Sequence, residues 1–256
     1  MKKIFAIIGN PISHSLSPIL HNYWFKKYSI NAEYTLLDVK ENELENITKK
    51  IRAKELDGIN ITLPYKQKII PFVDQLINDA KITNSINTIY LGQNNTLIGE
   101  NTDVFGLQAA YLKEITQTEN KKALVIGAGG VSPSVIFSLY KMKIKNISLV
   151  NRTYDKSIFL KKKFKFLNIL DWKFLKQEIK NFDIIINATS LGLKTTDKLP
   201  FDITRSSTNA VIADIIMQPE ETELLKHAKS LGRSIHYGKY MIESQIDLVG
   251  RFLKLW

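Results

Sequence analysis

A glycine-rich turn near the middle of the chain carries residues that can bind phosphate groups. The apolar run Lys122–Ile126 leads directly into Gly-Ala-Gly-Gly at 127–130, and a helical pattern follows. Glycine lets backbone N–H groups approach phosphate oxygens closely, and the N-terminus of the following helix adds partial positive charge. The turn therefore predicts a site for the pyrophosphate of a dinucleotide, although Ser132 stands where the usual motif has its third glycine.

The residues after the next apolar run distinguish between two dinucleotides. The run Ile147–Val150 is followed by Asn151, Arg152 and Thr153, with Lys156 shortly beyond. A site for NAD usually has Asp or Glu here, because a carboxylate binds the ribose hydroxyls. An arginine instead pairs with phosphate through two parallel N–H bonds. The sequence therefore predicts NADP(H), whose additional phosphate these residues suit.

A lysine and an aspartate in the first half of the chain could handle a proton. Pro64 keeps the preceding residue extended, so Asn60 and Thr62 project on one face of the chain. Lys66 is expected at a helix start, an unfavourable place for a cation, which indicates a functional role. Asp103, taken alone, is typical of a helix N-cap. Paired with Lys66, it would orient an ammonium toward a carbonyl that develops alkoxide charge during hydride reduction.

Hydroxyl and amide side chains near the first apolar run could bind an anion. Ser15 and Ser17 alternate in an extended turn before a helix, so both can point at one anion. Simple capping of that helix by one of them is the alternative. Asn87 is expected within a later strand.

A hydrolase is the alternative of a different class. Ala188-Thr189-Ser190-Leu191-Gly192 resembles a nucleophile elbow, and Asp214 and His236 follow in the order Ser, Asp, His. The first glycine of such an elbow is replaced by alanine, and the segment lies inside the nucleotide-binding unit. We therefore expect Thr189 and Ser190 to lie along the dinucleotide.

Composition excludes several classes of protein. The chain of 256 residues has 44% hydrophobic residues, which is typical of a globular protein, and it has no cysteine, which excludes disulfides and thiolate catalysis. No two of its four histidines have helical ligand spacing, so we expect no metal. The net charge of +11 comes mainly from scattered lysines, so we expect a small anionic substrate and no nucleic acid. The apolar run at 4–8 is too short for a signal peptide, and none is long enough to span a membrane, which predicts a cytoplasmic protein.

The alternation of strand and helix patterns predicts an α/β fold with mainly parallel sheets. Strands are expected at 4–8, 34–39, 57–61, 86–91, 123–126, 147–150, 183–187 and 211–214. Helices are expected at 17–28, 41–53, 75–82, 103–115, 134–143, 154–166 and 222–231, with a last amphipathic segment at 240–256. We expect a substrate domain over 1–102, a doubly wound, Rossmann-like dinucleotide domain over 103–238 and a C-terminal helix over 239–256.

Taken in order, these segments resemble the shikimate dehydrogenase family along nearly the whole chain. The stretches that carry the resemblance are Gly9–Pro18, Asn60–Lys66, Ser85–Thr88, Asn101–Asp103, Gly127–Gly130, Asn151–Thr153, Asn187–Ser190 and Met241–Gln245. The resemblance implies reversible reduction of 3-dehydroshikimate to shikimate by NADPH, in the pathway to chorismate and the aromatic amino acids. It also implies that the C-terminal helix packs on the substrate domain and that the protein is a monomer or homodimer.

The resemblance also implies roles for individual residues. Lys66 is the acid/base, paired with Asp103, and Ser15 and Ser17 hold the substrate carboxylate. The other expected substrate contacts are Asn60, Thr62, Asn87, Asp103, Met217 and Gln245. The expected cofactor contacts are Gly127, Ala128, Gly129, Gly130, Val131, Asn151, Arg152, Thr153, Lys156, Thr189, Ser190, Ile215 and Gly238.

Three positions depart from the family pattern. Met217 replaces a tyrosine, Lys156 replaces an arginine, and Tyr240 replaces a small residue. The nearest alternative activity is a quinate/shikimate dehydrogenase that uses NAD, and Arg152 argues against it. A binding protein without catalysis is a further alternative, and the presence of both Lys66 and Asp103 argues against that.

Overall fold

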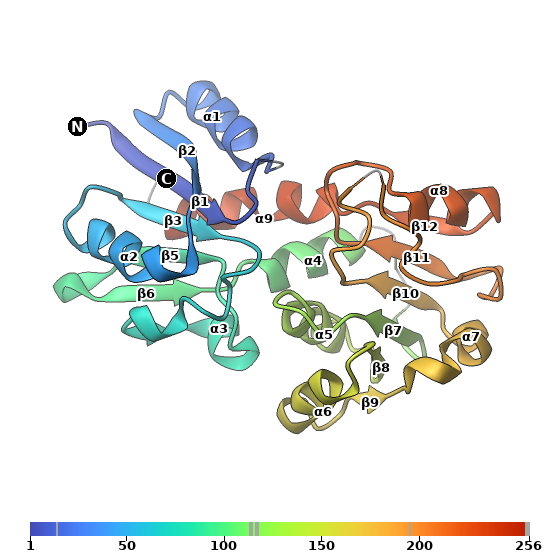
Figure 1. Ribbon diagram of the computed structural model, residues 1–256. Helices are drawn as coiled ribbons and strands as arrows, with labels where there is room; N and C mark the ends of the chain where they lie inside the picture. The colour runs from blue at the N-terminus through green and yellow to red at the C-terminus, as the bar shows by residue number, and fades with distance from the viewer. Residues whose placement is uncertain (14, 113–114, 116–117, 195, 254–256) are drawn as a thin grey trace. The chain divides into compact units, whose positions relative to one another are not determined.

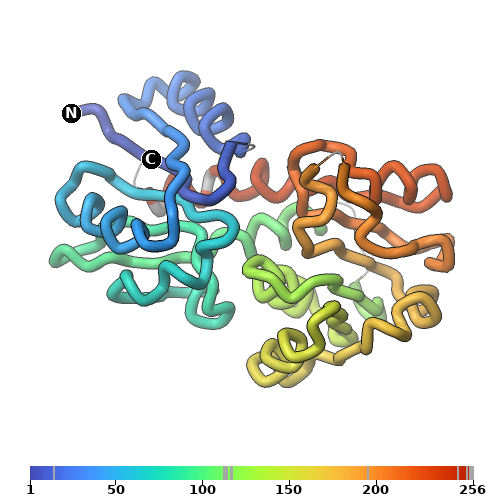
Figure 2. The backbone as a smooth tube through the Cα atoms, in the orientation of Figure 1, coloured from blue at the N-terminus to red at the C-terminus, as the bar shows by residue number. Residues whose placement is uncertain are grey.

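The computed structural model describes residues 1–13, 15–112, 115, 118–194 and 196–253 and contains two compact units. Unit 1 comprises Met1–Asp103 and Gln245–Trp256, and unit 2 comprises Val104–Ser244. Figure 2 traces the chain through both units. No helix in the described ranges is long and apolar enough to cross a membrane.

The sheet of unit 1 has six strands in the order β2-β1-β3-β5-β6-β4 (Figure 1). Their bounds are β1 Lys3–Gly9, β2 Ala32–Asp38, β3 Gly58–Ile61, β4 Gln75–Leu76, β5 Thr88–Leu91 and β6 Leu97–Glu100. β1 pairs in parallel with β2 and β3, whereas β5 pairs antiparallel with both β3 and β6. The connection between β5 and β6 is too short for a parallel crossover, so these strands form a hairpin. The sequence did not predict β6. Its proposed helix at 75–82 begins three residues too early, because 75–76 pairs with β6 and the helix starts at residue 78.

Both faces of this sheet are buried. The helices of unit 1 are α1 Ser17–Lys27, η1 Glu41–Glu43, α2 Leu44–Arg52, η2 Ile70–Phe72, α3 Asn78–Thr83 and η3 Gln93–Asn95. Successive side chains of β1 point to opposite faces of the sheet. Ala6 and Ile8 belong to one apolar cluster with Ile47 of α2, whereas Phe5 belongs to another with Val249 of the last helix, α9 Lys239–Phe252.

The sheet of unit 2 is entirely parallel, in the order β12-β11-β10-β7-β8-β9 (Figure 1). The strands are β7 Lys122–Ile126, β8 Asn146–Val150, β9 Asn168–Ile169, β10 Ile184–Asn187, β11 Val211–Asp214 and β12 Ser234–His236. From the adjacent central strands β7 and β10, the chain adds β8 and β9 on one side of the sheet and β11 and β12 on the other. This reversal confirms the doubly wound fold and places a switch point at the carboxyl ends of those strands, where such folds bind ligands.

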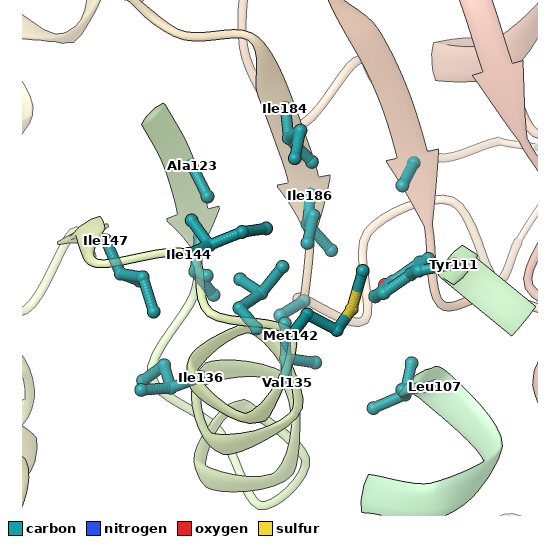
Figure 3. Packing of buried hydrophobic residues seen from close by; sticks show 14 of the residues in the cluster. Leu107, Tyr111, Ala123, Val135, Ile136, Met142, Ile144, Ile147, Ile184 and Ile186 are labelled. Atoms are coloured by element: carbon teal, nitrogen blue, oxygen red, sulfur yellow. The ribbon is translucent and has the colours of Figure 1, made fainter. Parts of the chain in front are cut away.

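The helices of unit 2 cover both faces of its sheet. They are α4 Asp103–Leu112, α5 Ser132–Lys141, α6 Tyr154–Lys163, η4 Trp172–Phe174, α7 Leu175–Glu178, η5 Ile179–Asn181 and α8 Glu223–Ser230. Val135 and Ile136 of α5 belong to one apolar cluster with Ile186 of β10 and Tyr111 of α4, and Figure 3 shows part of this cluster. The other face packs Ile185 against α8. Positions 113–114 and 254–256, which two predicted helices included, lie outside the described residues.

Candidate active site

Lys66 and Asp103 form a nearly buried ion pair in unit 1. Lys66 Nζ lies 2.6 Å from Asp103 Oδ2, and the two side chains are 11% and 1% exposed. Lys66 lies in a turn after β3 rather than at a helix start, because the chain continues through turns to η2. Asp103 is the first residue of α4, and its backbone N–H donates to Asn101 Oδ1. The ammonium is therefore held by a carboxylate that is itself fixed at a helix start.

Asn87 holds the second oxygen of the Asp103 carboxylate. Its Nδ2 donates to Asp103 Oδ1 and to Thr102 Oγ1, both at 2.8 Å, and its Oδ1 accepts from the backbone N–H of Thr102 at 2.9 Å. Asn87 lies one residue before β5 rather than within it, so the prediction of a strand position is wrong by one residue. Each Asp103 oxygen thus has its own donor, which sets the orientation of the carboxylate.

The last helix brings Gln245 to the same network. Thr102 Oγ1 donates to Gln245 Oε1 at 2.8 Å, and Asn87 Nδ2 lies 3.4 Å from the same oxygen. Gln245 is buried, as are Asn87 and Thr102. Thr102 was not predicted as a site residue, and its position between Asn101 and Asp103 was the available signal.

The remaining predicted substrate residues of unit 1 differ in their surroundings. Ser15 Oγ accepts from the backbone N–H of Ser17 at 3.3 Å. The N-cap residue of α1 is Leu16, whose side chain makes no capping hydrogen bond, so neither serine caps the helix in the way that the alternative expects. Ser17 is buried, whereas Thr62, which follows β3, is partly exposed. Asn60 is buried and gives both of its amide hydrogens to protein acceptors.

In unit 2, the glycine-rich turn is held together by Ser132. Ser132 Oγ donates to the carbonyl of Gly127 at 2.8 Å and accepts from the N–H of Gly129 at 3.0 Å. Gly127 has φ +108°, a left-handed conformation that favours glycine. Ser132 therefore closes the turn in place of a third glycine, a role that the sequence motif did not predict. A Cβ at Gly129 would meet nothing within 4 Å, so space is open where a phosphate would approach.

The loop after β8 is tied to this turn. Asn151 Oδ1 accepts from Ala128 N–H at 3.1 Å, and its Nδ2 donates to the Thr153 carbonyl at 2.8 Å. Arg152 and Lys156 are exposed, and no carboxylate among the described residues pairs with either. An open glycine turn beside two cations without an acidic partner in the described part of the chain fits a phosphorylated dinucleotide.

Several predicted cofactor residues are apolar or small. Ala128, Val131 and Ile215 pack against the apolar cluster of Figure 3, as does Met217, which was predicted as a substrate contact. A Cβ at Gly238 would lie 2.4 Å from the carbonyl oxygen of Ile216, so glycine permits a close approach of two loops there. Gly130 and Val131 are partly buried at the start of α5. Met217 offers a thioether where the family usually has a hydroxyl.

Asp214 anchors two loops at the carboxyl edge of the unit 2 sheet. Its carboxylate accepts from Asn187 Nδ2 with both oxygens at 3.2 Å, from Thr222 Oγ1 at 2.8 Å and from Ile216 N–H at 3.0 Å. Asn187 Oδ1 in turn accepts from Thr189 N–H and Oγ1. These donors match the acceptor capacity of a carboxylate, so Asp214 is not free to orient a histidine as the hydrolase alternative requires. Ser190 is exposed.

Burial of Asp214 predicts a pH-dependent contribution to stability. Burial raises the pKa of Asp214 from 3.8 to about 6, against the opposing effect of its hydrogen bonds. Because the folded state binds this proton more tightly, the contribution is greatest below pH 4, falls between about pH 4 and 6, and is lost above that. In Asp214→Asn this titration is absent. We expect the unfolding free energy of the unmodified protein, relative to the variant, to fall by about 3 kcal/mol between pH 3.5 and 7.

Urea denaturation of both proteins at each pH measures this difference. A difference that stays constant across the range would show that Asp214 has the same pKa in the folded and unfolded states.

Comparisons with known proteins match a family model to a part of each unit. The shikimate dehydrogenase substrate binding domain matches residues 7–89, and the shikimate / quinate 5-dehydrogenase family matches residues 110–223. A shikimate dehydrogenase (NADP(+)) of Pelagibacter ubique is 46% identical over 94% of this chain and 89% of its own.

Solved structures show the same likeness over the whole fold. The shikimate dehydrogenase of Aquifex aeolicus has a TM-score of 0.90 and 33% identity, over 98% of this chain and 92% of its own. The Thermus thermophilus enzyme, solved with NADP(H) and shikimate, has a TM-score of 0.87 and 27% identity, over 98% and 93%. The resemblance predicted from the motifs is thereby confirmed: the chain belongs to the shikimate dehydrogenase family.

Proposed function

We propose that this protein catalyses the reversible, NADPH-dependent reduction of 3-dehydroshikimate to shikimate. The observation that carries the proposal is the buried Lys66–Asp103 pair, which supplies a positioned proton donor in unit 1. The family relationship supports the substrate, and the open glycine turn with Arg152 supports the cofactor.

Lys66 acts as the acid in the direction of reduction. When bound, NADPH supplies a hydride to the carbonyl carbon of the ketone. The carbonyl oxygen then takes a proton from the Lys66 ammonium, so the ketone becomes an alcohol and Lys66 becomes a neutral amine. Asp103 keeps the ammonium oriented and compensates its charge before the step. Asn87 keeps the carboxylate from rotating away, since it donates to the other carboxylate oxygen.

The substrate carboxylate is held by Ser15 and Ser17. Ser15 Oγ accepts from Ser17 N–H, so its own hydrogen is available to an anion near the start of α1. Thr62 and Gln245 contact ring hydroxyls. The chain's positive charge of +11 favours such an acidic substrate.

The cofactor is held by unit 2. The N–H groups of the glycine turn hold the pyrophosphate, and the Arg152 guanidinium, with Lys156 and Thr153, holds the additional phosphate of NADPH. Thr189 and Ser190 lie on the loop that Asn187 and Asp214 anchor, and Ile215 and Gly238 lie on neighbouring loops. These loops hold the nicotinamide end.

Steady-state oxidation of shikimate and of quinate, each with NADP+ and NAD+, tests the proposal. We expect kcat/KM to be highest for shikimate with NADP+, and at least about tenfold lower with NAD+, because a charge-assisted phosphate contact is lost. Faster oxidation of quinate, or preference for NAD+, would favour the quinate/shikimate alternative. Absence of oxidation under all four conditions would show that the proposed function is wrong.

We also propose a cytoplasmic location, where NADPH serves biosynthesis, and a monomer or homodimer. Cell fractionation tests the location, and light scattering coupled to gel filtration tests the oligomeric state.

A further inference from the structure

A buried tyrosine outside every sequence motif contacts the polar network of unit 1. Tyr34 lies in β2 and is 2% exposed, and its hydroxyl donates to Asn60 Oδ1 at 2.5 Å. Asn22 binds the backbone of Tyr34 at both its carbonyl and its N–H. The His21 ring stacks on the Tyr34 ring at 4.3 Å with an interplanar angle of 5°. Asn22 therefore fixes the backbone of Tyr34, His21 packs on its ring, and Asn60 accepts from its hydroxyl.

Asn60 is also hydrogen-bonded to the start of the neighbouring strand, β5. Its Nδ2 donates to the Asn87 carbonyl at 3.0 Å and to Thr88 Oγ1 at 2.9 Å. A backbone carbonyl only accepts, so the Asn60 amide nitrogen must face Asn87. The amide oxygen must then face Tyr34, and the phenol must be the donor. Tyr34 and Asn87 together permit a single orientation of this amide.

The network continues to the ion pair. Thr88 Oγ1 donates to Asn87 Oδ1 at 3.2 Å, Asn87 Nδ2 donates to Asp103 Oδ1, and Asp103 Oδ2 accepts from Lys66. An uninterrupted series of hydrogen bonds therefore links the Tyr34 hydroxyl to the Lys66 ammonium. Every member of the series except Lys66 is less than 9% exposed.

The surroundings of Tyr34 keep its hydroxyl a donor. Burial raises the pKa of Tyr34, with a smaller opposing effect of the Ser17 hydroxyl, and burial lowers the pKa of the stacked His21 to about 4. Both rings are therefore uncharged at neutral pH. The stacked imidazole adds no positive charge that would favour ionisation of the phenol.

We propose that Tyr34 is a positioning residue, which acts through Asn60 and Asn87 to hold the Asp103 carboxylate and the Lys66 ammonium in their reactive geometry. The inference rests on the proposed function of Lys66 as acid/base. Without the phenol hydroxyl, the buried Asn60 oxygen loses its donor from Tyr34. Only the two hydrogen bonds of Asn60 Nδ2 then hold the amide, so its contact with Asn87 is less well fixed.

Tyr34→Phe removes only the hydroxyl and keeps the ring that stacks on His21. We expect kcat for shikimate oxidation to fall about tenfold, the effect of losing one buried hydrogen bond from a positioned group. We expect KM for NADP+ to change by less than about twofold, because unit 2 holds the cofactor. Tyr65→Phe is the matched control, since the buried Tyr65 hydroxyl donates to the Val39 carbonyl at 2.7 Å, outside the network. This variant should keep kcat within about twofold.

A double-mutant cycle separates positioning from general stability. In an Asn60→Ala background there is no amide to orient, so Tyr34→Phe should have no further effect on kcat. Asn60→Asp leaves Tyr34 intact but removes the amide donor to Asn87, so it should lower kcat by a similar factor. This variant tests the inference if Tyr34→Phe does not fold.

An unchanged kcat in Tyr34→Phe or in Asn60→Asp would overturn the inference. So would a further fall in kcat when Tyr34→Phe is added to Asn60→Ala. These outcomes are distinct from failure of the proposed function, which would appear as absence of shikimate oxidation by the unmodified protein.

Discussion

Replacing Lys66 with alanine is expected to lower kcat for shikimate oxidation by ~10²-fold or more, with little change in NADPH affinity. The ammonium of Lys66 is held 2.6 Å from Asp103 Oδ2 in unit 1. Without the Lys66 amine, the alcohol proton has no positioned acceptor during oxidation. Without the ammonium that this amine becomes, the developing alkoxide has no adjacent cation. Steady-state kinetics give kcat, and quenching of protein fluorescence by NADPH gives the affinity.

Lys68→Ala is the matched control for this variant. Lys68 lies two residues further on, is exposed, and pairs with Glu41 at the surface, so its loss should leave kcat nearly unchanged. Lys66→Ala also leaves the Asp103 carboxylate buried without its cation, so the melting temperature of each variant must be measured. If the Lys66→Ala protein is folded and its kcat is close to that of the unmodified protein, Lys66 is not the acid/base.

Replacing Arg152 with alanine is expected to raise KM for NADP+ by about 10- to 100-fold and to leave KM for NAD+ nearly unchanged. The Arg152 side chain is exposed, and no carboxylate within the described ranges pairs with it. Its guanidinium can therefore bind a phosphate without first breaking an ion pair. The substitution removes only the contact with the additional phosphate, which NAD+ lacks. Initial rates at saturating shikimate with each nucleotide measure both constants.

Arg205→Ala is the control for the loss of one positive charge. Arg205 is an exposed arginine of the same unit and lies outside the proposed nucleotide site. Its replacement should change both constants by less than about twofold, because a distant surface charge is screened by salt. Equal increases in KM for NADP+ and NAD+ in Arg152→Ala would show that Arg152 does not contact the additional phosphate of NADP+.

Local sequence patterns were sufficient where a structure depends on neighbouring residues. The apolar runs of β7, β8, β10 and β11 were predicted within one or two residues of their observed bounds, because buried parallel strands are continuously apolar. The start of α1 was predicted correctly from Ser17 and Pro18. Short strands such as β9 and β12, of two and three residues, gave too brief a pattern to detect.

Side chains that need a distant partner could not be predicted in this way. Tyr34 reads as an ordinary strand residue, and its hydrogen bond to Asn60 joins positions 26 residues apart. Thr102 and Gln245 are 143 residues apart, and Gln245 was proposed only through the family resemblance. Ser132 appeared as a defect in a glycine motif, yet its hydroxyl closes the turn.

The sequence by itself determined the α/β class and the glycine-rich turn after β7, because glycine, proline and apolar periodicity act on adjacent residues. Only the tertiary structure decided which polar groups meet. The strand order places β3 next to β5 and lets the Tyr34 side chain of β2 reach Asn60 of β3 across β1. The antiparallel turn from β5 into β6 brings Asn101–Asp103 to Asn87. A buried polar group must find a partner, and that partner is set by strand order and register rather than by its neighbours in the chain.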